Sequence, residues 1–175
     1  MIETSRLKLI PFTENHFKAI LNDDNVALVK LLGVQPIQRW SEFDAAREAI
    51  HALHNIQQSL EGDWRWGAFF ILLASPPTLI GTCGFLGKPD EENCVEIGYE
   101  IHPHYQEQGF ATETVKALTQ FAFSQKVDKV KAHTLAEKNA SNHVLQKCGF
   151  RFSKAFTDPN DGPVWQWTAH RTIAP

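Results

Sequence analysis

The sequence predicts a single domain of the α+β class, in which α and β segments are mixed, and three observations carry this prediction. Segments with helical periodicity and segments with strand periodicity alternate along the whole chain. Residues 1–175 contain no linker, no internal repeat and no second block of composition. With 175 residues, 43% of them hydrophobic, the chain is long enough for one core that removes roughly 70% of the unfolded surface from water.

A strand and one or two short helices are expected at the beginning of the chain. The segment RLKLIPF, residues 6–12, alternates polar and apolar side chains, which is typical of a strand. Residues 13–32 are expected to be helical, with Thr13 as a possible cap. Gly33 and Pro36 end this run because neither residue favours a continuing helix.

A longer helix and a hairpin are expected next. Ser41 is the expected cap of the helix, and Gly62 lies just past its end. Apolar residues recur along it at helical spacing: Phe43, Ala46, Ile50, Leu53, Ile56 and Leu60. The following segment, WRWGAFFILLASPPTLIGTCGFLG, has two apolar, β-rich runs separated by the turn Ser75–Thr78. We expect Trp64 and Trp66 to lie on the first strand and to share one face of it.

The C-terminal half has the clearest strand of the chain. CVEIGYEI, residues 94–101, alternates strictly, so that Glu96 and Glu100 share one face and the apolar residues share the other. Helical spacing follows over 109–126. The remaining elements are expected to be a strand in VKAHTLA, a short helix over 139–148 capped by Ser141, and two strands around 150–156 and 164–170.

Charge and composition exclude several classes of function. Seventeen basic against 20 acidic residues argue against a general nucleic-acid partner, because neutralising a phosphate backbone needs a surplus of Lys and Arg. The longest mostly apolar run, Trp66–Ala74, is far shorter than the ~20 residues of a membrane helix, and the N-terminus resembles no export signal. Three widely spaced cysteines form no disulfide or zinc pattern. We therefore expect a cytoplasmic protein without a membrane or nucleic-acid partner.

The most informative stretch is the sequence HPHYQEQGFAT, residues 102–112, between a strand and a helix. Backbone N–H groups at a helix start have no intrahelical partner and lie at the positive end of the helix dipole, so they can bind an anion. Gly109 lets a phosphate approach the backbone, and Ala111 and Thr112 keep the first turn open. The alternative is a glycine that only turns the chain. Neither a P-loop nor a dinucleotide-binding fingerprint is present.

Two motifs in this half of the chain are similar to those of the GNAT superfamily of N-acetyltransferases. Gln106-x-x-Gly109-x-Ala111 resembles the loop with which that family binds the pyrophosphate of acetyl-CoA. The block EIGYEIHPHYQEQGFATETVKAL, followed by NASNHVLQKCGF, looks like the RimJ/RimL subgroup, which acetylates N-terminal amino groups of ribosomal proteins and related amines. The resemblance covers residues 6–171 in element order.

The resemblance implies a fold and a set of residues that bind the co-substrate acetyl-CoA. The GNAT fold is a central, twisted, mostly antiparallel sheet flanked by helices, with one parallel pair of strands that splay apart. Here these would be the strand ending at Ile101 and the strand over 129–135. The family uses the strand backbone for pantetheine and the loop for pyrophosphate. The residues that carry over are Ile101, Gln106, Gln108, Gly109, Phe110, Ala111, Thr112 and, on the second motif, Asn139.

Acetyl transfer to an amine needs a base for the nitrogen and a proton for the thiolate that leaves. Glu96 is the first candidate base, directly or through water, and Glu100 is the second. Either carboxylate could equally be an ion-paired or solvated group on the polar face of the strand. Ser141 matches the position that RimL-type enzymes use as the acid, although a serine at a helix start is also a cap.

The sequence thus leaves two functions open. The first is an acetyl-CoA-dependent N-acetyltransferase that acts by direct attack in a ternary complex on a primary amine, for example the N-terminus of a protein such as a ribosomal protein. The second is a catalytically silent GNAT-fold module that binds acyl-CoA as a sensor or interaction domain. No metal site is expected, because the eight histidines lack a third converging ligand. The chain could be a monomer or a homodimer.

Overall fold

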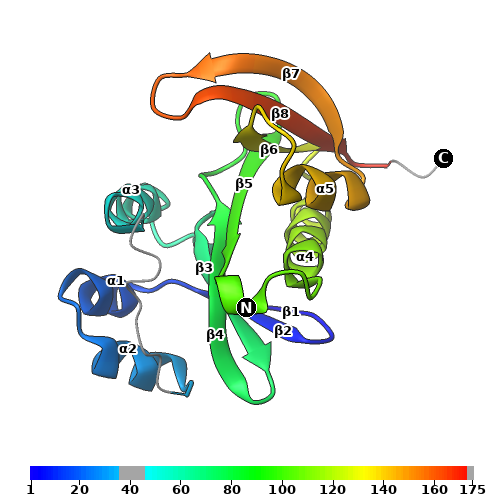
Figure 1. The fold of residues 1–175 in the computed structure, drawn as a ribbon. Coiled ribbons are helices and arrows are strands. Elements are labelled where there is room, and N and C mark those ends of the chain that lie inside the picture. The colour runs from blue at the N-terminus through cyan, green and yellow to red at the C-terminus, as the bar shows by residue number, and fades with distance from the viewer. Residues whose placement is uncertain (36–45, 173–175) are drawn as a thin grey trace.

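The computed structural model describes residues 1–35 and 46–172 (Figure 1). The strands are β1 (Ile2–Glu3), β2 (Leu7–Pro11), β3 (Ala68–Ala74), β4 (Pro77–Phe85), β5 (Cys94–Ile101), β6 (Lys129–Leu135), β7 (Arg151–Asp158) and β8 (Gly162–His170). The α-helices are α1 (Glu14–Leu21), α2 (Asn25–Leu32), α3 (Ala46–Ser59), α4 (Phe110–Ser124) and α5 (Ala140–Lys147). Two short 3₁₀ turns are η2 (Trp64–Trp66) and η3 (Pro103–Tyr105).

The strands form one sheet in the order β1-β2-β3-β4-β5-β6-β8-β7. Neighbouring strands pair antiparallel, with the exception of β5 and β6, which run parallel. The turn between β3 and β4 lies within the expected Ser75–Thr78, but it is shorter, because Pro77 and Thr78 already pair with β3. The predicted α+β architecture, with a mostly antiparallel sheet and one parallel pair, is therefore confirmed.

Helices cover the two faces of the central strands separately (Figure 1). On one face, Val115 and Leu118 of α4 pack into a core that includes Phe69 of β3. On the other face, Phe17 of α1 packs into a second core that includes Phe70. Because successive residues of a strand point to opposite faces, the adjacent Phe69 and Phe70 serve different cores. The sheet is thus buried on both sides at its centre, which explains the continuous apolar run of β3.

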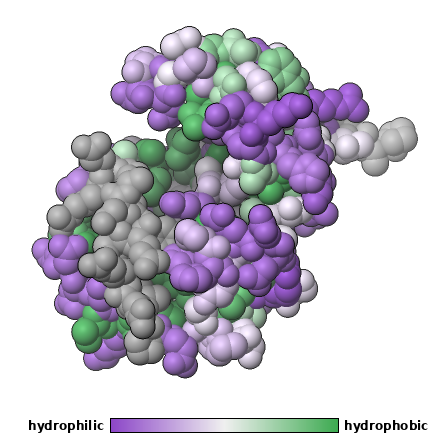
Figure 2. Space-filling model, in the orientation of Figure 1, coloured by the Kyte–Doolittle hydropathy of each residue, from purple (hydrophilic) through white to green (hydrophobic). Residues whose placement is uncertain are grey.

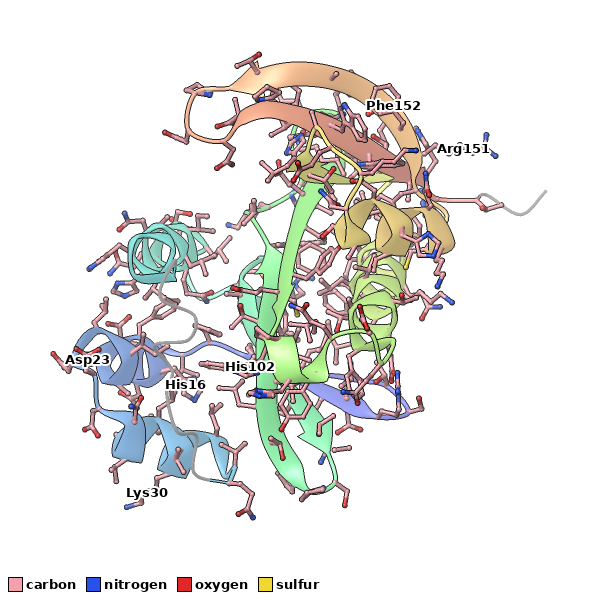
Figure 3. All side chains as sticks on the ribbon, viewed as in Figure 1. His16, Asp23, Lys30, His102, Arg151 and Phe152 are labelled. Carbon is pink, nitrogen blue, oxygen red and sulfur yellow. The ribbon has the colours of Figure 1, made fainter. Side chains whose placement is uncertain are left out.

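Two turns in the α1–α2 region follow from their residue types. Thr13 is the N-cap residue of α1, and its N–H donates to Nδ1 of His16 at 3.0 Å. His16 lies between α1 and the sheet, where its ring meets that of Phe70 edge-on (Figure 3). Gly33 ends α2 in the left-handed conformation, with φ of 63°, which glycine adopts without a steric penalty.

Three details of the element assignments differ from expectation or cannot be compared with it. Trp64 and Trp66 lie in the η2 turn and not on a strand, because Asp63 caps that turn by accepting from the Arg65 N–H. The expected cap Ser41 and the apolar Phe43 lie outside the described residues. Within the described part of the chain, no helix combines the length and the hydropathy that crossing a bilayer requires.

Candidate functional site

β5 and β6 separate halfway along their length and leave a gap in the sheet. They pair only where Cys94, Val95 and Glu96 face Lys129, Val130 and Lys131. Beyond this point, residues 97–101 pair with β4 alone, and residues 132–135 pair with β8 alone. The predicted splay of these two strands is present at the expected residues. Because backbone groups alternate between the two sides of a strand, the second half of β5 presents N–H and C=O groups to the gap.

The turn before α4 supplies further unpaired backbone donors. Gly109 is the N-cap residue of α4 and has φ of 82°, in the left-handed region that favours glycine. The Glu113 N–H donates to the Gly109 carbonyl at 3.0 Å, and the N–H groups of residues 110–112 precede this bond at the helix start. These groups lie at the positive end of the helix dipole. The turn therefore has the glycine conformation and the helix-start donors on which the predicted anion site depends.

The gap and the turn line one cavity of about 420 Å³, which is the size of a small-molecule site. Eight residues of its lining were predicted from the sequence as site residues: Glu100, Ile101, Gln106, Gly109, Phe110, Ala111, Thr112 and Ser141. Gln106 also holds the turn against the end of β5, because its side-chain amide donates to the Ile101 carbonyl at 2.9 Å. Its neighbours in the lining include His143 and Lys147 of α5.

Two of the residues expected to bind the cofactor are engaged elsewhere. The side chain of Gln108 donates to the His104 carbonyl at 3.1 Å and does not line the cavity. Asn139, and not Ser141, caps α5: its side chain accepts from the Asn142 N–H at 3.0 Å. The expected cap at Ser141 was wrong by two residues, because Asn139 already satisfies the free donor at the helix start. Ser141 is left in the first turn of α5, on the cavity wall.

The two candidate bases on β5 have different surroundings. Glu96 lies beside the paired part of the strands, where its Oε1 is 2.7 Å from Nδ1 of His133 and its Oε2 is 3.9 Å from Nζ of Lys131. Glu100 lies beside the gap and lines the cavity. Burial raises the pKa of Glu100, and the nearby His102, which directly follows β5 (Figure 3), opposes this shift. Glu96 is thus an ion-paired group, whereas Glu100 is available to a ligand.

Tyr99 is a site residue that the sequence analysis did not single out. Its ring lines the cavity on the α4 face of the sheet, and its hydroxyl donates to the Ser141 carbonyl at 3.4 Å. Burial raises the pKa of Tyr99 to about 12, so the phenol keeps its proton at neutral pH. The strict alternation of CVEIGYEI placed Tyr99 on the apolar face, but only the fold shows that this face borders the gap.

Arg6 is a second residue that the sequence analysis did not single out. With Thr4 and Glu113 it forms a cluster of contacts beside the turn before α4, which we call the brace. Its Nε lies 2.7 Å from Oε2 of Glu113 in the first turn of α4. One guanidinium nitrogen donates to the Gln108 carbonyl at 3.1 Å, and the guanidinium carbon lies 4.3 Å from the centre of the Phe110 ring. Thr4 also donates to Glu113, at 2.6 Å. The contacts join segments more than a hundred residues apart, so no local pattern could reveal them.

The glutamate at the centre of this brace is held in its charged form. Burial alone would raise the pKa of Glu113, but hydrogen bonds from Thr4 and Arg6 outweigh it and lower the pKa. A charged Glu113 fixes the guanidinium of Arg6 close to the turn. The brace therefore sets the position of Gly109 and of the donors that follow it.

The described residues offer no alternative site for a metal ion. Across 1–35 and 46–172, no three His, Cys, Asp or Glu side chains gather where they could hold one. Cys83 and Cys94 are buried thiols, and Cys148 is half-buried, with its Sγ 3.5 Å from the Thr112 carbonyl. The polar groups of the cavity lining include backbone donors, Glu100, Ser141 and Tyr99.

Comparison with known proteins agrees with this geometry. The family model described as an acetyltransferase (GNAT) domain matches residues 6–151. The chain belongs to the GNAT acetyltransferase family. The N-acetyltransferase YjdG of Bacillus subtilis, named as uncharacterized, is 28% identical over 151 residues, which cover 86% of this chain and 89% of YjdG. The family prediction from the two motifs is confirmed.

Solved structures confirm the GNAT fold. A GNAT-family acetyltransferase from Bacillus anthracis superposes with a TM-score of 0.64 at 19% identity and covers 97% of both chains. The spermidine N-acetyltransferase of Vibrio cholerae, solved with CoA and spermine, has a TM-score of 0.64 at 18% identity and covers 95% of this chain and 96% of its own. The fold is thus an acyltransferase fold, and a structural neighbour binds CoA.

Proposed function

We propose that this GNAT protein transfers the acetyl group of acetyl-CoA to a primary amine by direct attack in a ternary complex. One observation carries the proposal: the part of β5 that no longer pairs with β6 and the unpaired N–H groups after Gly109 line the same cavity. The strand edge suits the amides of pantetheine, and the turn suits the pyrophosphate. Each charge-assisted N–H bond to a phosphate contributes about 1.5–3 kcal/mol. Lys147 on the cavity wall adds a positive charge for the same phosphates.

Glu100 is the group best placed to accept the proton of the attacking amine. The amine nitrogen forms a bond to the thioester carbonyl, the carbon–sulfur bond breaks, and the nitrogen loses a proton. At neutral pH an α-amine loses its proton for roughly 1 kcal/mol, whereas a lysine-type amine needs roughly 4.6 kcal/mol. Glu100 is among the residues that line the cavity, while the carboxylate of Glu96 faces His133. The base assignment therefore moves to the second of the two residues that the sequence indicated.

The thiolate that leaves needs a proton or a hydrogen bond, and two residues of the cavity lining, Ser141 and Tyr99, carry hydroxyl groups. Ser141 lines the cavity beside Tyr99, whose hydroxyl contacts the Ser141 carbonyl. Because the raised pKa of Tyr99 keeps its phenol protonated, it is a donor throughout the working pH range. We assign the acid role to Ser141, with Tyr99 as the neighbouring donor. Most of the rate acceleration then comes from holding the two reactants together.

The direct test measures release of the free CoA thiol from acetyl-CoA with a panel of primary amines. The panel contains an N-terminal peptide amine, a small alkylamine and a polyamine, and a reaction without amine gives the hydrolysis background. We expect amine-dependent thiol release and an acetylated product seen by mass spectrometry. Saturable acetyl-CoA binding without thiol release for any amine would instead support the silent acyl-CoA-binding module.

A further inference from the structure

A second cavity lies on the opposite face of β5, between the sheet and α3. Its volume is about 190 Å³, below the ~300–1,000 Å³ of a site for a whole small molecule. Leu53 of α3 and Leu86, which follows β4, are the aliphatic residues of its lining. Figure 2 shows the surface hollowed between α3 and the β7–β8 hairpin, with apolar residues at its floor. A cavity of this size and lining suits an apolar side group.

The two cavities meet at the end of β5. Tyr99 and Glu100 line both of them. Glu100 is the one charged side chain among the described residues that line the smaller cavity. Cys83, which also lines it, stays neutral because complete burial raises the pKa of its thiol. An amine held at Glu100 would therefore face the cofactor site on one side and an uncharged, largely apolar cavity on the other.

Two glycines face each other across β4 and β5 in the floor of this cavity. The fold requires glycine at one of these positions but not at the other. Gly84 is paired with Gly98 in the sheet register. A Cβ at Gly84 would come within 2.5 Å of the Gly67 carbonyl oxygen, and Gly84 has φ of 154°, so the fold requires glycine there. A Cβ at Gly98 would meet nothing within 4 Å, and its φ lies outside the left-handed region. The fold does not require glycine at position 98.

Resting on the proposed function, we propose that this second cavity receives an apolar substituent of the acceptor, and that the missing side chain at Gly98 keeps it open. Gly98 and Glu100 are two apart on one strand and therefore share a face, so an amine at Glu100 places its substituent over Gly98. The acceptor is then a primary amine with a compact apolar group. An extended polyamine would press a second ammonium group against apolar walls without a partner, which costs free energy.

The test compares leucine amide with glycine amide, which differ only in the apolar side chain beside the reacting amine. Putrescine serves as a compact diamine. In the unmodified protein, leucine amide should have a kcat/KM about 10-fold or more above that of glycine amide, since filling an apolar pocket with several methyl and methylene groups discriminates at this level. Equal or lower kcat/KM for leucine amide, or a preference for putrescine, would overturn the proposal.

Two substitutions then change the cavity from opposite walls. Gly98→Val fills the floor and should abolish the preference for leucine amide over glycine amide, with the affinity for acetyl-CoA unchanged. Gly98→Ala should give a smaller loss of that preference. Leu53→Ala enlarges the opposite wall and should shift the preference toward bulkier amines, which keeps the test open if Gly98→Val does not fold. Thr168→Val, which adds an apolar group to β8 outside both cavities, is the control. An unchanged preference in both cavity variants would contradict the proposal.

Binding separates this inference from the proposed function. The same amides are titrated against the protein saturated with CoA and followed by ligand-observed NMR. If leucine amide binds, Gly98→Val abolishes that binding and no amine is acetylated, the cavity assignment stands and the enzyme assignment fails. If thiol release is seen with amines but without any dependence on Gly98 or Leu53, the enzyme assignment stands and the cavity assignment fails. If neither binding nor turnover is seen, both fail.

Discussion

The two cavities that meet at Glu100 are lined by different parts of the residues: one mainly by backbone groups, the other mainly by side chains. The larger one is made by backbone: an opened strand edge and the N–H groups after Gly109. The smaller one lies between α3, β4 and β5, where side chains form its walls and two glycines, Gly84 and Gly98, lie in its floor. Backbone donors bind a pyrophosphate whatever else the molecule acts on, whereas side-chain walls select one substituent over another. We infer that the larger cavity binds the acetyl donor, acetyl-CoA, and that the smaller one selects the amine that accepts the acetyl group. We call them the donor cavity and the acceptor cavity.

The largest effect should come from the residue that the two cavities share. Glu100→Gln keeps the shape of the side chain but removes its ability to accept a proton, so kcat/KM for amines should fall by about 100-fold or more. Acetyl-CoA affinity should be unchanged. Glu96→Gln, on the same face of the same strand, should lower kcat/KM by no more than about fivefold, because a partly exposed ion pair contributes about 0.2–1 kcal/mol. Steady-state thiol release measures both.

The pH dependence of kcat/KM in the same two variants, Glu100→Gln and Glu96→Gln, tests which of the two glutamates is the base. Below the pKa of the amine, log kcat/KM should fall with a slope of one as pH is lowered, because less free amine is present. Burial raises the pKa of Glu100, so the slope should steepen to two at a pH above the usual carboxyl range. Glu100→Gln should lose the steepening and Glu96→Gln should keep it. The reverse pattern would return the base assignment to Glu96.

A smaller effect, confined to the donor cavity, is expected at Gly109. Gly109→Ala places a Cβ at φ of 82°, where an L-residue is disfavoured by about 1–2 kcal/mol, and the turn must shift. The shift should weaken one or two N–H bonds to the pyrophosphate and lower acetyl-CoA affinity by about 30-fold. Gly33→Ala is the matched control: its φ is 63°, it has no neighbour within 4 Å, and it lies at the end of α2.

Calorimetric titration of acetyl-CoA into the two glycine variants distinguishes strain from binding. Both variants should unfold at lower temperature, because both place an L-residue in the left-handed region. Only Gly109→Ala should lose affinity. Equal affinities in the two variants would mean that the turn before α4 does not hold the cofactor, and the proposed roles of the two cavities would have to be abandoned.

Much of the lining of the larger cavity could be predicted from the sequence because its parts are local. The strand over 94–101, the turn around Gly109 and the helix after it are contiguous, and each has a characteristic residue pattern. The splay of β5 and β6 was predicted from the resemblance to the GNAT superfamily, whose fold has such a pair of strands. The errors were also local: Trp64 and Trp66 continue an apolar run, but Asp63 caps a turn at that point.

The acceptor cavity could not be predicted because its parts lie far apart in the chain. Leu53, the end of β4 and Gly98 meet only after the hairpin and α3 have packed on the sheet. The choice between Glu96 and Glu100 as the base depends on tertiary structure in the same way. Both share one face of β5, but which of them borders the gap depends on where β6 stops pairing. A tertiary pairing, and not a residue type, decides that question.

The smallest effect is expected from the brace that joins the first strands to the donor cavity. Arg6→Ala removes the contacts with Glu113, Gln108 and Phe110, so the turn loses part of its rigidity, and acetyl-CoA affinity should fall by about 10-fold, the equivalent of ~1.4 kcal/mol. Because Arg6 does not touch the acceptor cavity, kcat at saturating acetyl-CoA and the preference among amines should be unchanged.

A matched arginine separates the brace from general stability. Arg65 has the same exposed fraction as Arg6, 46%, and pairs with Asp63 at the same distance, 2.7 Å. Its other partner is Gln125, at the far end of α4 from the turn. Arg65→Ala should leave acetyl-CoA affinity unchanged. Arg6→Lys keeps the charge but loses the planar fork that reaches two partners, so it should recover only part of the affinity. If the two alanine variants lose affinity equally, the Arg6 contacts do not position the turn, and the donor cavity is rigid without them.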